Sequence, residues 1–458
     1  MPQKIIETIA SAPAETLEKT LVATQRLAKK LTDNKPVKKA ERYWAALGPG
    51  LTTGAADDDP SGIATYSQTG AQYGYNLLWL SFFSFPLMAV VQEMCARIGL
   101  VTGRGLAGNI KRHYAKWVLY ACTALLFAAN TFNIGADLGA MAKATQLLQP
   151  HFNFYSLVVF FTLISLMLQI FTNYSQYAKY LKWLALVLLT YVLSVFFVRL
   201  DGKALLSNTL LPHLTFGRDE IFLICGILGT TISPYLFFWQ TSQEVEEEIL
   251  AGKTSIKLRQ SETTRGEIKK MRTDVWTGMF FSNAVMFFII VNCAAALHQN
   301  GITDIKTAAD AAAALKPIAG PMASLLFALG VIGIGLLAVP VLAGSTAYAM
   351  SEAMGWKQGL YRKLSQAKPF YGIIIISMLL GMLLNFMGLD PIKSLIYAAV
   401  LNGLVAPVIL VLIVQISGNK KIMNHHANGP ALNTIGWIAT ALMILVGAAT
   451  LAIFIVPA

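Results

Sequence analysis

Long apolar blocks dominate this sequence. Most are about 20 residues long or longer, the length that a helix needs to cross a hydrocarbon core of roughly 30 Å. Charged residues make up only 13% of the 458 residues, too few to cover a water-soluble globule. The sequence therefore predicts an all-α polytopic membrane protein with about eleven spans, at about 45–72, 75–100, 116–148, 154–172, 180–199, 219–247, 273–298, 317–351, 370–388, 392–416 and 432–456.

The basic residues lie mostly in the short segments between these blocks. The net charge is +12, and the more basic segments alternate along the chain, although the 200–218 loop fits the alternation weakly. This positive-inside pattern predicts a cytoplasmic N-terminus and an outside C-terminus in the plasma or inner membrane. The same placement argues for the lipid bilayer, and against nucleic acid, as the partner of the basic residues. We expect a cytoplasmic segment over 1–44 and a single transmembrane domain over 45–458.

Two spans are interrupted by polar residues and proline. The first contains the sequence DDDPSG and the sixth contains TTISP. Proline removes a helix donor and clashes with the preceding turn, and backbone freed in this way at membrane depth is tolerated only in protein or beside a cavity. Five spans separate one interruption from the other, which predicts an inverted repeat. Its halves are expected at about 45–199 and 219–416, with an additional helix at about 432–456.

Three consecutive carboxylates are the residues whose placement in a membrane costs the most free energy. Asp57, Asp58 and Asp59 lie within the first span, where each charged carboxylate costs roughly 2.5–3.5 kcal/mol. One interpretation is an extramembrane loop that turns at Pro60 and Ser61. The favoured interpretation is that one or more of these carboxylates face a cation in a water-filled cavity of a secondary transporter.

Several motifs resemble one transporter family. The segment GPG…DPSGIATYSQTGAQYGYNLLW is similar to the first helix of the NRAMP divalent-metal transporters, GPG…DPGN…GAQ(F/Y)GY.LLW. The segments MCARIGLVTGRGLA, ADLGAMAKA and GILGTTISPYLFFWQTS are similar to motifs of the family's second, third and sixth spans. The similarity runs from about Gly48 to span 10. It implies a LeuT-like 5+5 inverted repeat with helices 1 and 6 broken, and divalent-cation transport by alternating access.

The resemblance places the family's metal ligands at four positions. Its aspartate falls on Asp59 and its helix-6 backbone carbonyl falls on Thr230. Its asparagine falls on Gly62, which has no side chain to donate, and its methionine falls on Ser233. The pattern therefore departs from the family's standard site at two of the four positions.

These departures favour a hard cation. A thioether prefers softer transition metals, and a hydroxyl at Ser233 removes that preference. Asp57 and Asp58 add oxygen ligands, and the small Gly62 leaves room for water. Mg²⁺ prefers oxygen ligands and usually keeps several waters. The resemblance is to the NRAMP-related magnesium transporters. We expect the cargo to be partly hydrated Mg²⁺, with Mn²⁺ also transported. We expect the protein to be a monomer and to hold no resident cofactor.

The residues that the family resemblance links to proton movement are also changed. The two helix-6 histidines fall on Tyr235 and Gln240, and the acidic pair of span 3 keeps Asp137 but has Ala140 in place of its glutamate. Asn402 is the polar residue nearest to the glutamine expected in span 10. These losses predict transport without proton coupling.

Two alternatives to this coupling prediction stay open. Asp57 or Asp58 can carry a proton, because crowded carboxylates titrate together. Asp137 is either a remnant of the proton route or a polar residue satisfied between helices.

Metal transport is not the only function that the pattern permits. Broken-helix folds also carry organic solutes, so a carrier of an amine or amino acid is the main alternative, with the amine paired to Asp59. A sensor built on the same scaffold would need a signalling domain, and the sequence contains no such insertion. No nucleophile–base constellation predicts an enzyme. Outside the site, Glu93 and Arg97 lie one helical turn apart and predict a stabilising pair.

Overall fold

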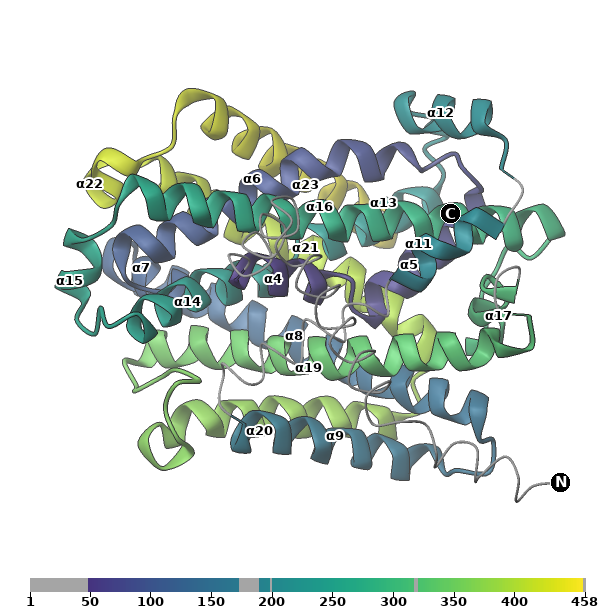
Figure 1. Ribbon diagram of the computed structural model, residues 1–458, viewed down its shortest axis with the longest axis horizontal. Helices are drawn as coiled ribbons and strands as arrows, with labels where there is room; N and C mark the ends of the chain where they lie inside the picture. The colour runs from purple at the N-terminus through teal and green to yellow at the C-terminus, as the bar shows by residue number, and fades with distance from the viewer. Residues whose placement is uncertain (1–47, 173–188, 198–199, 317–319, 456–458) are drawn as a thin grey trace, which may run out of the picture. The chain divides into compact units, whose positions relative to one another are not determined.

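The computed structural model describes residues 48–172, 189–197, 200–316 and 320–455. The chain divides into a unit of residues 1–48 and a unit of residues 49–458, and the second is the one described below. Its described residues form helices and connecting segments without a strand. Figure 1 shows the long helices lying side by side. Nine helices of the described ranges are long and apolar enough to cross a membrane, which confirms the predicted all-α polytopic class.

The first half of the unit contains the predicted spans 1–5. Span 1 is divided into α4 (Pro49–Asp57) and α5 (Pro60–Tyr73). Spans 2, 3 and 4 are α6 (Trp79–Thr102), α8 (Lys116–Leu148) and α9 (Phe154–Phe171), with the short α7 (Leu106–His113) between the first two. Span 5 was expected at 180–199 and lies largely outside the described residues, which contribute α11 (Leu189–Ser194) and η2 (Val195–Phe197) to it.

The second half repeats the division. After α12 (Gly202–Leu210), span 6 is divided into α13 (Arg218–Thr231) and α14 (Pro234–Leu250). Spans 7–11 are α16 (Arg265–Ala296), α19 (Ala323–Met354), α20 (Lys368–Leu384), α21 (Pro391–Gly418) and α23 (Pro430–Ile455). Short helices α15 (Ile256–Ser261), α17 (Ala308–Ala313) and α22 (Lys420–Met423) occupy the connections.

The helix of the seventh span extends beyond its apolar block. The block begins at about 273, and α16 begins at Arg265. The reason is a capping box, in which the Thr264 hydroxyl accepts from the Glu267 N–H at 3.2 Å and the Glu267 carboxylate accepts from the Thr264 N–H at 2.8 Å. This reciprocal capping satisfies two helix-end donors, so the helix starts within polar sequence.

Both predicted helix breaks are confirmed. Pro60 begins α5 and Pro234 begins α14. Proline suits the first turn of a helix, where its missing N–H would have no intrahelical partner, and it cannot continue the helix that precedes it. A proline after a short polar run thus ends one helix and starts another at the same depth.

Close backbone contact holds α4 against α16. A Cβ atom on Gly278 would lie 2.1 Å from the Gly50 carbonyl oxygen, and one on Gly54 would lie 2.3 Å from the Gly278 carbonyl oxygen. Only glycine permits this approach. As a result, almost all of α4 is buried, although its sequence is mixed and partly polar.

The expected pair of Glu93 and Arg97 forms and is part of a larger group. The Glu93 carboxylate, which is 1% exposed, pairs with Arg97 on the same helix. It also accepts from Arg272 at 2.8 Å and from the Trp276 indole N–H at 2.7 Å, both on α16. The pair therefore joins α6 to α16 rather than stabilising one helix alone.

Candidate functional site

The two helix breaks lie side by side. At the start of α14, the Tyr235 hydroxyl donates a hydrogen bond of 2.7 Å to the Ala56 carbonyl at the end of α4. At the end of α13, the Thr230 hydroxyl lies 2.9 Å from the hydroxyl of Tyr66 on α5. Each half of one broken helix is thus tied to a half of the other.

Asp59 sits in the break of the first span and is held from two helices. It is the N-cap of α5. Its Oδ1 accepts from the Gly62 N–H at 2.7 Å and from the Ser61 hydroxyl at 2.6 Å, and its Oδ2 accepts from the Asn133 side-chain amide of α8 at 2.9 Å. The carboxylate is 1% exposed. These donors fix the orientation of the carboxylate.

Asp57 and Asp58 are directed toward α16 instead. The Ser282 hydroxyl lies 2.5 Å from Asp57 Oδ2 and 3.4 Å from Asp58 Oδ1. Asp57 Oδ1 and Asp58 Oδ2 are buried without a hydrogen-bond partner in the described residues. The three carboxylates therefore do not converge on one point, and the described ranges contain no group of three or more Asp, Glu, His or Cys residues arranged around a metal position.

Thr230 and Ser233 present oxygen atoms at the other break. The Ser233 hydroxyl lies 2.7 Å from the Gly229 carbonyl oxygen and 2.5 Å from that of Thr230, and it donates its proton to this helix end. The Thr230 hydroxyl lies 2.9 Å from the Ile227 carbonyl oxygen. Both hydroxyls keep lone pairs that can accept or coordinate.

Gly62 contacts Asp59, whereas Gln240 has other hydrogen-bond partners. Gly62 contributes its backbone N–H to Asp59, and a Cβ there would have its nearest neighbours at ordinary contact distances of 3.4–3.5 Å. Gln240 instead accepts from Thr53 of α4 at 2.5 Å and donates to Glu244 at 2.8 Å. The structure therefore places Gln240 in the contact between α4 and α14.

Asp137 and Asn402 are buried polar residues without partners in the described chain. Both side-chain oxygens of Asp137 and both polar atoms of Asn402 lack a hydrogen bond. Asp137 lies one helical turn after Asn133, on the same helix. Asn402 adjoins Gly403, whose backbone N would lie 2.4 Å from a Cβ on Gly229, so this part of α21 contacts the end of α13.

Four residues of the site were not found by sequence reasoning. Ser61 and Asn133 hold Asp59, Ser282 contacts Asp57 and Asp58, and Tyr66 contacts Thr230. The spacing of four between Asn133 and Asp137 placed both on one helix face and was a usable signal. Nothing in the sequence around Ser282 indicated which helix its hydroxyl would face.

This arrangement defines a class of protein. Paired broken helices, tied to each other inside a bundle of membrane-crossing helices, are the architecture of multi-pass secondary transporters. Residues 50–452 match the family described as Natural resistance-associated macrophage protein-like, or Nramp. The chain belongs to the Nramp family, which confirms the resemblance of its motifs.

Curated relatives match over nearly the whole chain. The divalent metal cation transporter MntH of Klebsiella pneumoniae subsp. pneumoniae is 28% identical over 407 residues, which cover 87% of this chain and 92% of that protein. MntH of Yersinia enterocolitica is 26% identical over 421 residues, which cover 91% of this chain and 96% of that protein.

Solved structures share the fold. The Eremococcus coleocola manganese transporter, in complex with an aromatic bis-isothiourea substituted compound, has a TM-score of 0.69 at 17% identity and covers 89% of this chain and 86% of its own. The inward-facing conformation of Mhp1 has a TM-score of 0.53 at 14% identity, and the match covers 88% of this chain and 90% of Mhp1. The predicted fold class, with its broken helices 1 and 6, is confirmed.

Proposed function

We propose that this chain carries divalent metal cations across the membrane by alternating access, with Asp59 as the principal ligand and Mg²⁺ as the preferred cargo. The observation that carries this proposal is the buried Asp59 carboxylate, oriented by Ser61, Gly62 and Asn133 between two broken helices. Its support from relatives is that MntH proteins, which share the family, are divalent metal cation transporters. The proposal includes no chemical step on a substrate.

The ligand atoms that surround the two breaks favour a hard cation. Asp59, Thr230 and Ser233 offer carboxylate, carbonyl and hydroxyl oxygens, and Ser233 stands where the family resemblance expects a methionine. Oxygen ligands suit Mg²⁺ and Mn²⁺, whereas a thioether favours softer metals. Because Gly62 supplies no side-chain ligand, the cation keeps part of its water shell.

In this proposal Asp57 and Asp58 attract the cation by their charge and bind the waters of its hydration shell. They face α16 rather than Asp59, and one oxygen of each is buried without a partner in the described chain. Two such carboxylates beside the break make it attractive to a cation. They bind the waters of a hydrated ion more readily than the ion itself, because their oxygens diverge from those of Asp59.

The hydrogen bonds at positions 235 and 240 support uncoupled transport. Tyr235 is committed to the Ala56 carbonyl, and Gln240 is committed to Thr53 and Glu244. Neither side chain forms a link that leads a proton away from Asp59. Asp137 is the acidic residue of α8 and is the alternative proton acceptor, which a pH gradient would reveal.

A small cavity adjoins the first helix break. It is lined in part by Pro60, Ser67 and Ala140 and has a volume of about 20 Å³, which holds about one water molecule. Asp59, Thr230 and Ser233 do not line it, so it is separate from the proposed ligand atoms.

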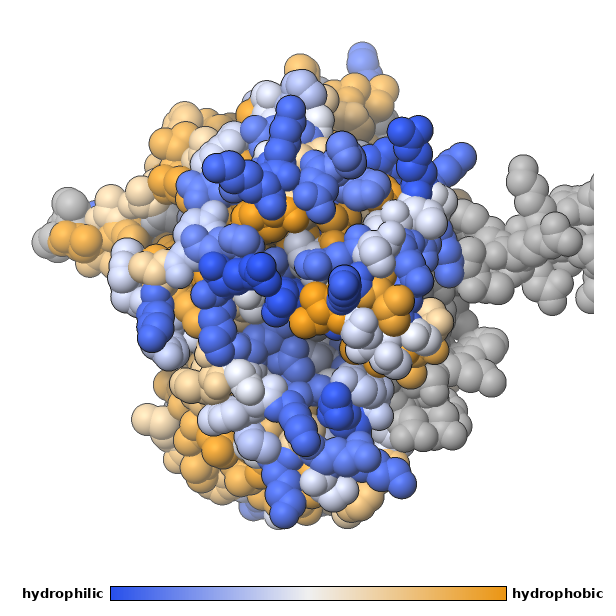
Figure 2. Space-filling model, turned by 90° about the vertical axis from the view of Figure 1, so that its left-hand side faces the viewer, coloured by the Kyte–Doolittle hydropathy of each residue, from blue (hydrophilic) through white to orange (hydrophobic). Residues whose placement is uncertain are grey.

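The orientation proposed here places the N-terminus and the basic end of the bundle in the cytoplasm. α7, α15 and α22, with the basic residues Lys111, Arg112, Arg259, Lys420 and Lys421, lie together at the left of Figure 1. Figure 2 looks onto this end and shows hydrophilic residues over much of it. Cytoplasmic placement follows from the positive-inside rule.

Flux measurements on proteoliposomes test the proposal. Mg²⁺ and Mn²⁺ uptake is expected from the wild type and lost in Asp59→Ala, while Glu262→Ala, an exposed carboxylate in the connection before α16, is expected to keep it. Uptake that is independent of an imposed pH gradient is expected, and titration calorimetry should show Mg²⁺ binding that Asp59→Ala removes. Absence of flux for Mg²⁺, Mn²⁺ and Cd²⁺ alike would contradict metal transport, and flux driven by the pH gradient would contradict uncoupled transport.

A further inference from the structure

A second cavity lies at the basic end, away from the helix breaks. It has a volume of about 510 Å³ and lies between the α6–α7 connection, α7, α14, α15, the end of α19 and the segment that follows α19. Its lining includes no residue of α4, α5 or α13. It is therefore separate from the candidate cation site. Five cationic residues line it: Arg104, Lys111, Arg259, Lys357 and Arg362.

The two carboxylates of this cavity do not neutralise those cations directly. Glu352 accepts from the backbone N–H groups of Gly105 at 2.8 Å and Gly108 at 2.7 Å. Glu246 accepts from the backbone N–H of Leu360 at 2.6 Å and from that of Tyr361 at 3.1 Å. In the described part of the chain, no ion pair within 4.0 Å involves any of the five cations.

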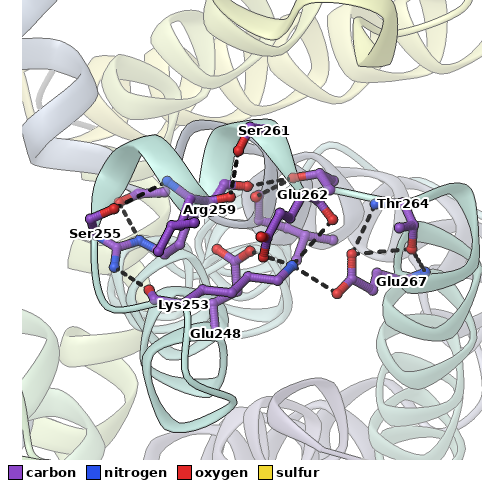
Figure 3. Close-up of polar contacts among 12 residues, drawn as sticks. Glu248, Lys253, Ser255, Arg259, Ser261, Glu262, Thr264 and Glu267 are labelled. Atoms are coloured by element: carbon purple, nitrogen blue, oxygen red, sulfur yellow. Dashed lines mark hydrogen bonds and ion pairs between the residues drawn. The ribbon is translucent and has the colours of Figure 1, made fainter.

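Arg259 is fixed in the cavity wall by a structured connection. Its guanidinium donates to the carbonyls of Gly103 at 3.2 Å, Lys253 at 2.8 Å and Thr254 at 3.2 Å. Lys253 in turn bridges Glu248 and Glu267, at 3.4 Å and 2.8 Å (Figure 3). A charged group held in place by neutral carbonyls keeps its positive charge available to a ligand.

Other cationic residues of the lining also have N–H donors that are not used in hydrogen bonds within the described residues. The Nε of Arg104 is buried without a hydrogen-bond partner in the described residues. Lys111 has a contact of 3.3 Å with the Glu352 carbonyl, and Lys357 is exposed. Arginine and lysine together at a partly enclosed site suit the several oxygens of a phosphate group, which accept charge-assisted hydrogen bonds.

The surroundings of the cavity are those of a membrane interface. α7 is amphipathic: its Leu106 and Ile110 are buried, and its Lys111 and Arg112 are exposed. Trp356, which lines the cavity, is 41% exposed. Such helices and exposed tryptophans lie at the level of lipid headgroups.

We propose that this cavity binds a phosphate group, supplied either by the headgroup of an anionic phospholipid or by a soluble phosphate. The site lies where basic pockets between transmembrane helices bind lipid headgroups on the cytoplasmic side. Binding there would tie together α7, α15 and the segment after α19, all of which contribute cations to it.

The test compares thermal unfolding of the full-length purified protein with and without each source of phosphate. EDTA is present throughout, so that no divalent cation contributes. One arm adds inorganic phosphate in detergent, against chloride at equal ionic strength. The other uses nanodiscs that contain phosphatidylglycerol, against phosphatidylcholine alone. Because a ligand that binds only the folded protein raises the unfolding midpoint, at least one arm is expected to raise it.

Charge-removing variants decide whether the cavity is responsible. Lys111→Gln with Lys357→Gln removes two exposed cations of the lining, and the ligand concentration for half of the rise is expected to increase about tenfold. Lys420→Gln with Lys421→Gln, two exposed lysines of α22 at the same end, is the matched control and should leave the rise unchanged. Should the first variant fold poorly, Lys357→Gln alone is compared with Lys421→Gln.

Each outcome decides between the sources or against the site. A rise with inorganic phosphate that the cavity variant weakens assigns a soluble phosphate. A rise only with phosphatidylglycerol that the cavity variant weakens assigns a lipid headgroup. No rise in either arm, or a rise that the cavity and control variants change equally, would overturn the proposal. Because the readout is stability without metal, these outcomes are independent of the flux experiments on Asp59.

Discussion

Asp274 of α16 caps the first turn of α4: its Oδ2 accepts from the Gly50 N–H at 2.7 Å, and its Oδ1 accepts from the Leu51 N–H at 3.2 Å. The first N–H groups of a helix have no intrahelical partner, so a carboxylate from another helix is a favourable cap. If transport follows the proposed alternating access, we expect α4 to move relative to α16. The Asp274 cap is one of the contacts that such a movement would break.

Replacing Asp274 by alanine should loosen α4. Loss of these bonds costs about 1–3 kcal/mol, which changes the balance between closed and open forms by roughly 5–150-fold. The measurement is the thiol-labelling rate of Ala56→Cys, a position that is fully buried on α4. Asp274→Asn keeps one oxygen acceptor and is the control, for which a smaller acceleration is expected. Equal labelling rates in Asp274→Ala and the parent would contradict the role of the cap.

Replacing Gly278 by alanine should destabilise the fold. Its Cβ would lie 2.1 Å from the Gly50 carbonyl oxygen, so α4 and α16 would have to separate. Overpacking of this kind typically costs about 1–3 kcal/mol, and the unfolding midpoint in detergent should fall. Gly372→Ala is the matched control, because no atom lies within 4 Å of its Cβ position on α20. Alanine is the better helix former by about 0.5–1 kcal/mol, so the control midpoint should rise or stay.

Gln68 holds the far end of α5. Its Oε1 accepts from the Ile305 N–H at 2.9 Å, and its Nε2 donates to the Thr303 carbonyl at 3.2 Å. Gln68→Leu should release the 303–305 segment and expose the cavity beside it. Faster labelling of Ser67→Cys, which lines that cavity, is the expected result.

Gln72 supplies the control for this change. In the described chain its side chain accepts a hydrogen bond of 3.0 Å from Gln68 and makes none to the 303–305 segment. Gln72→Leu should therefore leave the labelling of Ser67→Cys close to the parent rate. If Gln72→Leu accelerates labelling as much as Gln68→Leu does, the clamp is not specific to Gln68.

Removing Glu93 should cost far more stability than breaking a surface ion pair. Glu93→Ala leaves Arg97, whose side chain is 5% exposed, without its carboxylate. An uncompensated buried charge costs about 3–5 kcal/mol. Lys306→Ala breaks a pair with Asp304 whose side chains are 75% and 63% exposed, and such pairs contribute about 0–1 kcal/mol. Unfolding midpoints of the two variants check the difference, and similar midpoints would contradict it.

A thioether at position 233 should change ion preference. Ser233→Met places sulfur at the helix 6 break, and sulfur favours softer metals. Uptake of Cd²⁺ relative to Mg²⁺ should rise in proteoliposomes, with Asp59 still required. Ser233→Ala, which removes the hydroxyl without adding sulfur, separates the two effects. An unchanged ratio in Ser233→Met would place the cation away from Ser233.

Local features of the chain were enough to predict the spans and both breaks. Apolar length determines which segments cross a membrane, and Pro60 and Pro234 interrupt their helices by a steric effect on the neighbouring turn. Hydropathy indicates only the apolar part of α16, and the capping box of Thr264 and Glu267 determines where the helix itself begins. The order of the motifs along the chain was enough to indicate the family.

The directions of the side chains were decided by the tertiary structure. Asp57, Asp58 and Asp59 are adjacent in sequence, but packing turns the first two toward Ser282 and the third toward Asn133. At a helix break, no periodicity relates one residue to the next, so only the neighbouring helices determine where each carboxylate points. The sequence by itself determined where the membrane spans break, and only the packing of α8 and α16 decided which partners the carboxylates meet.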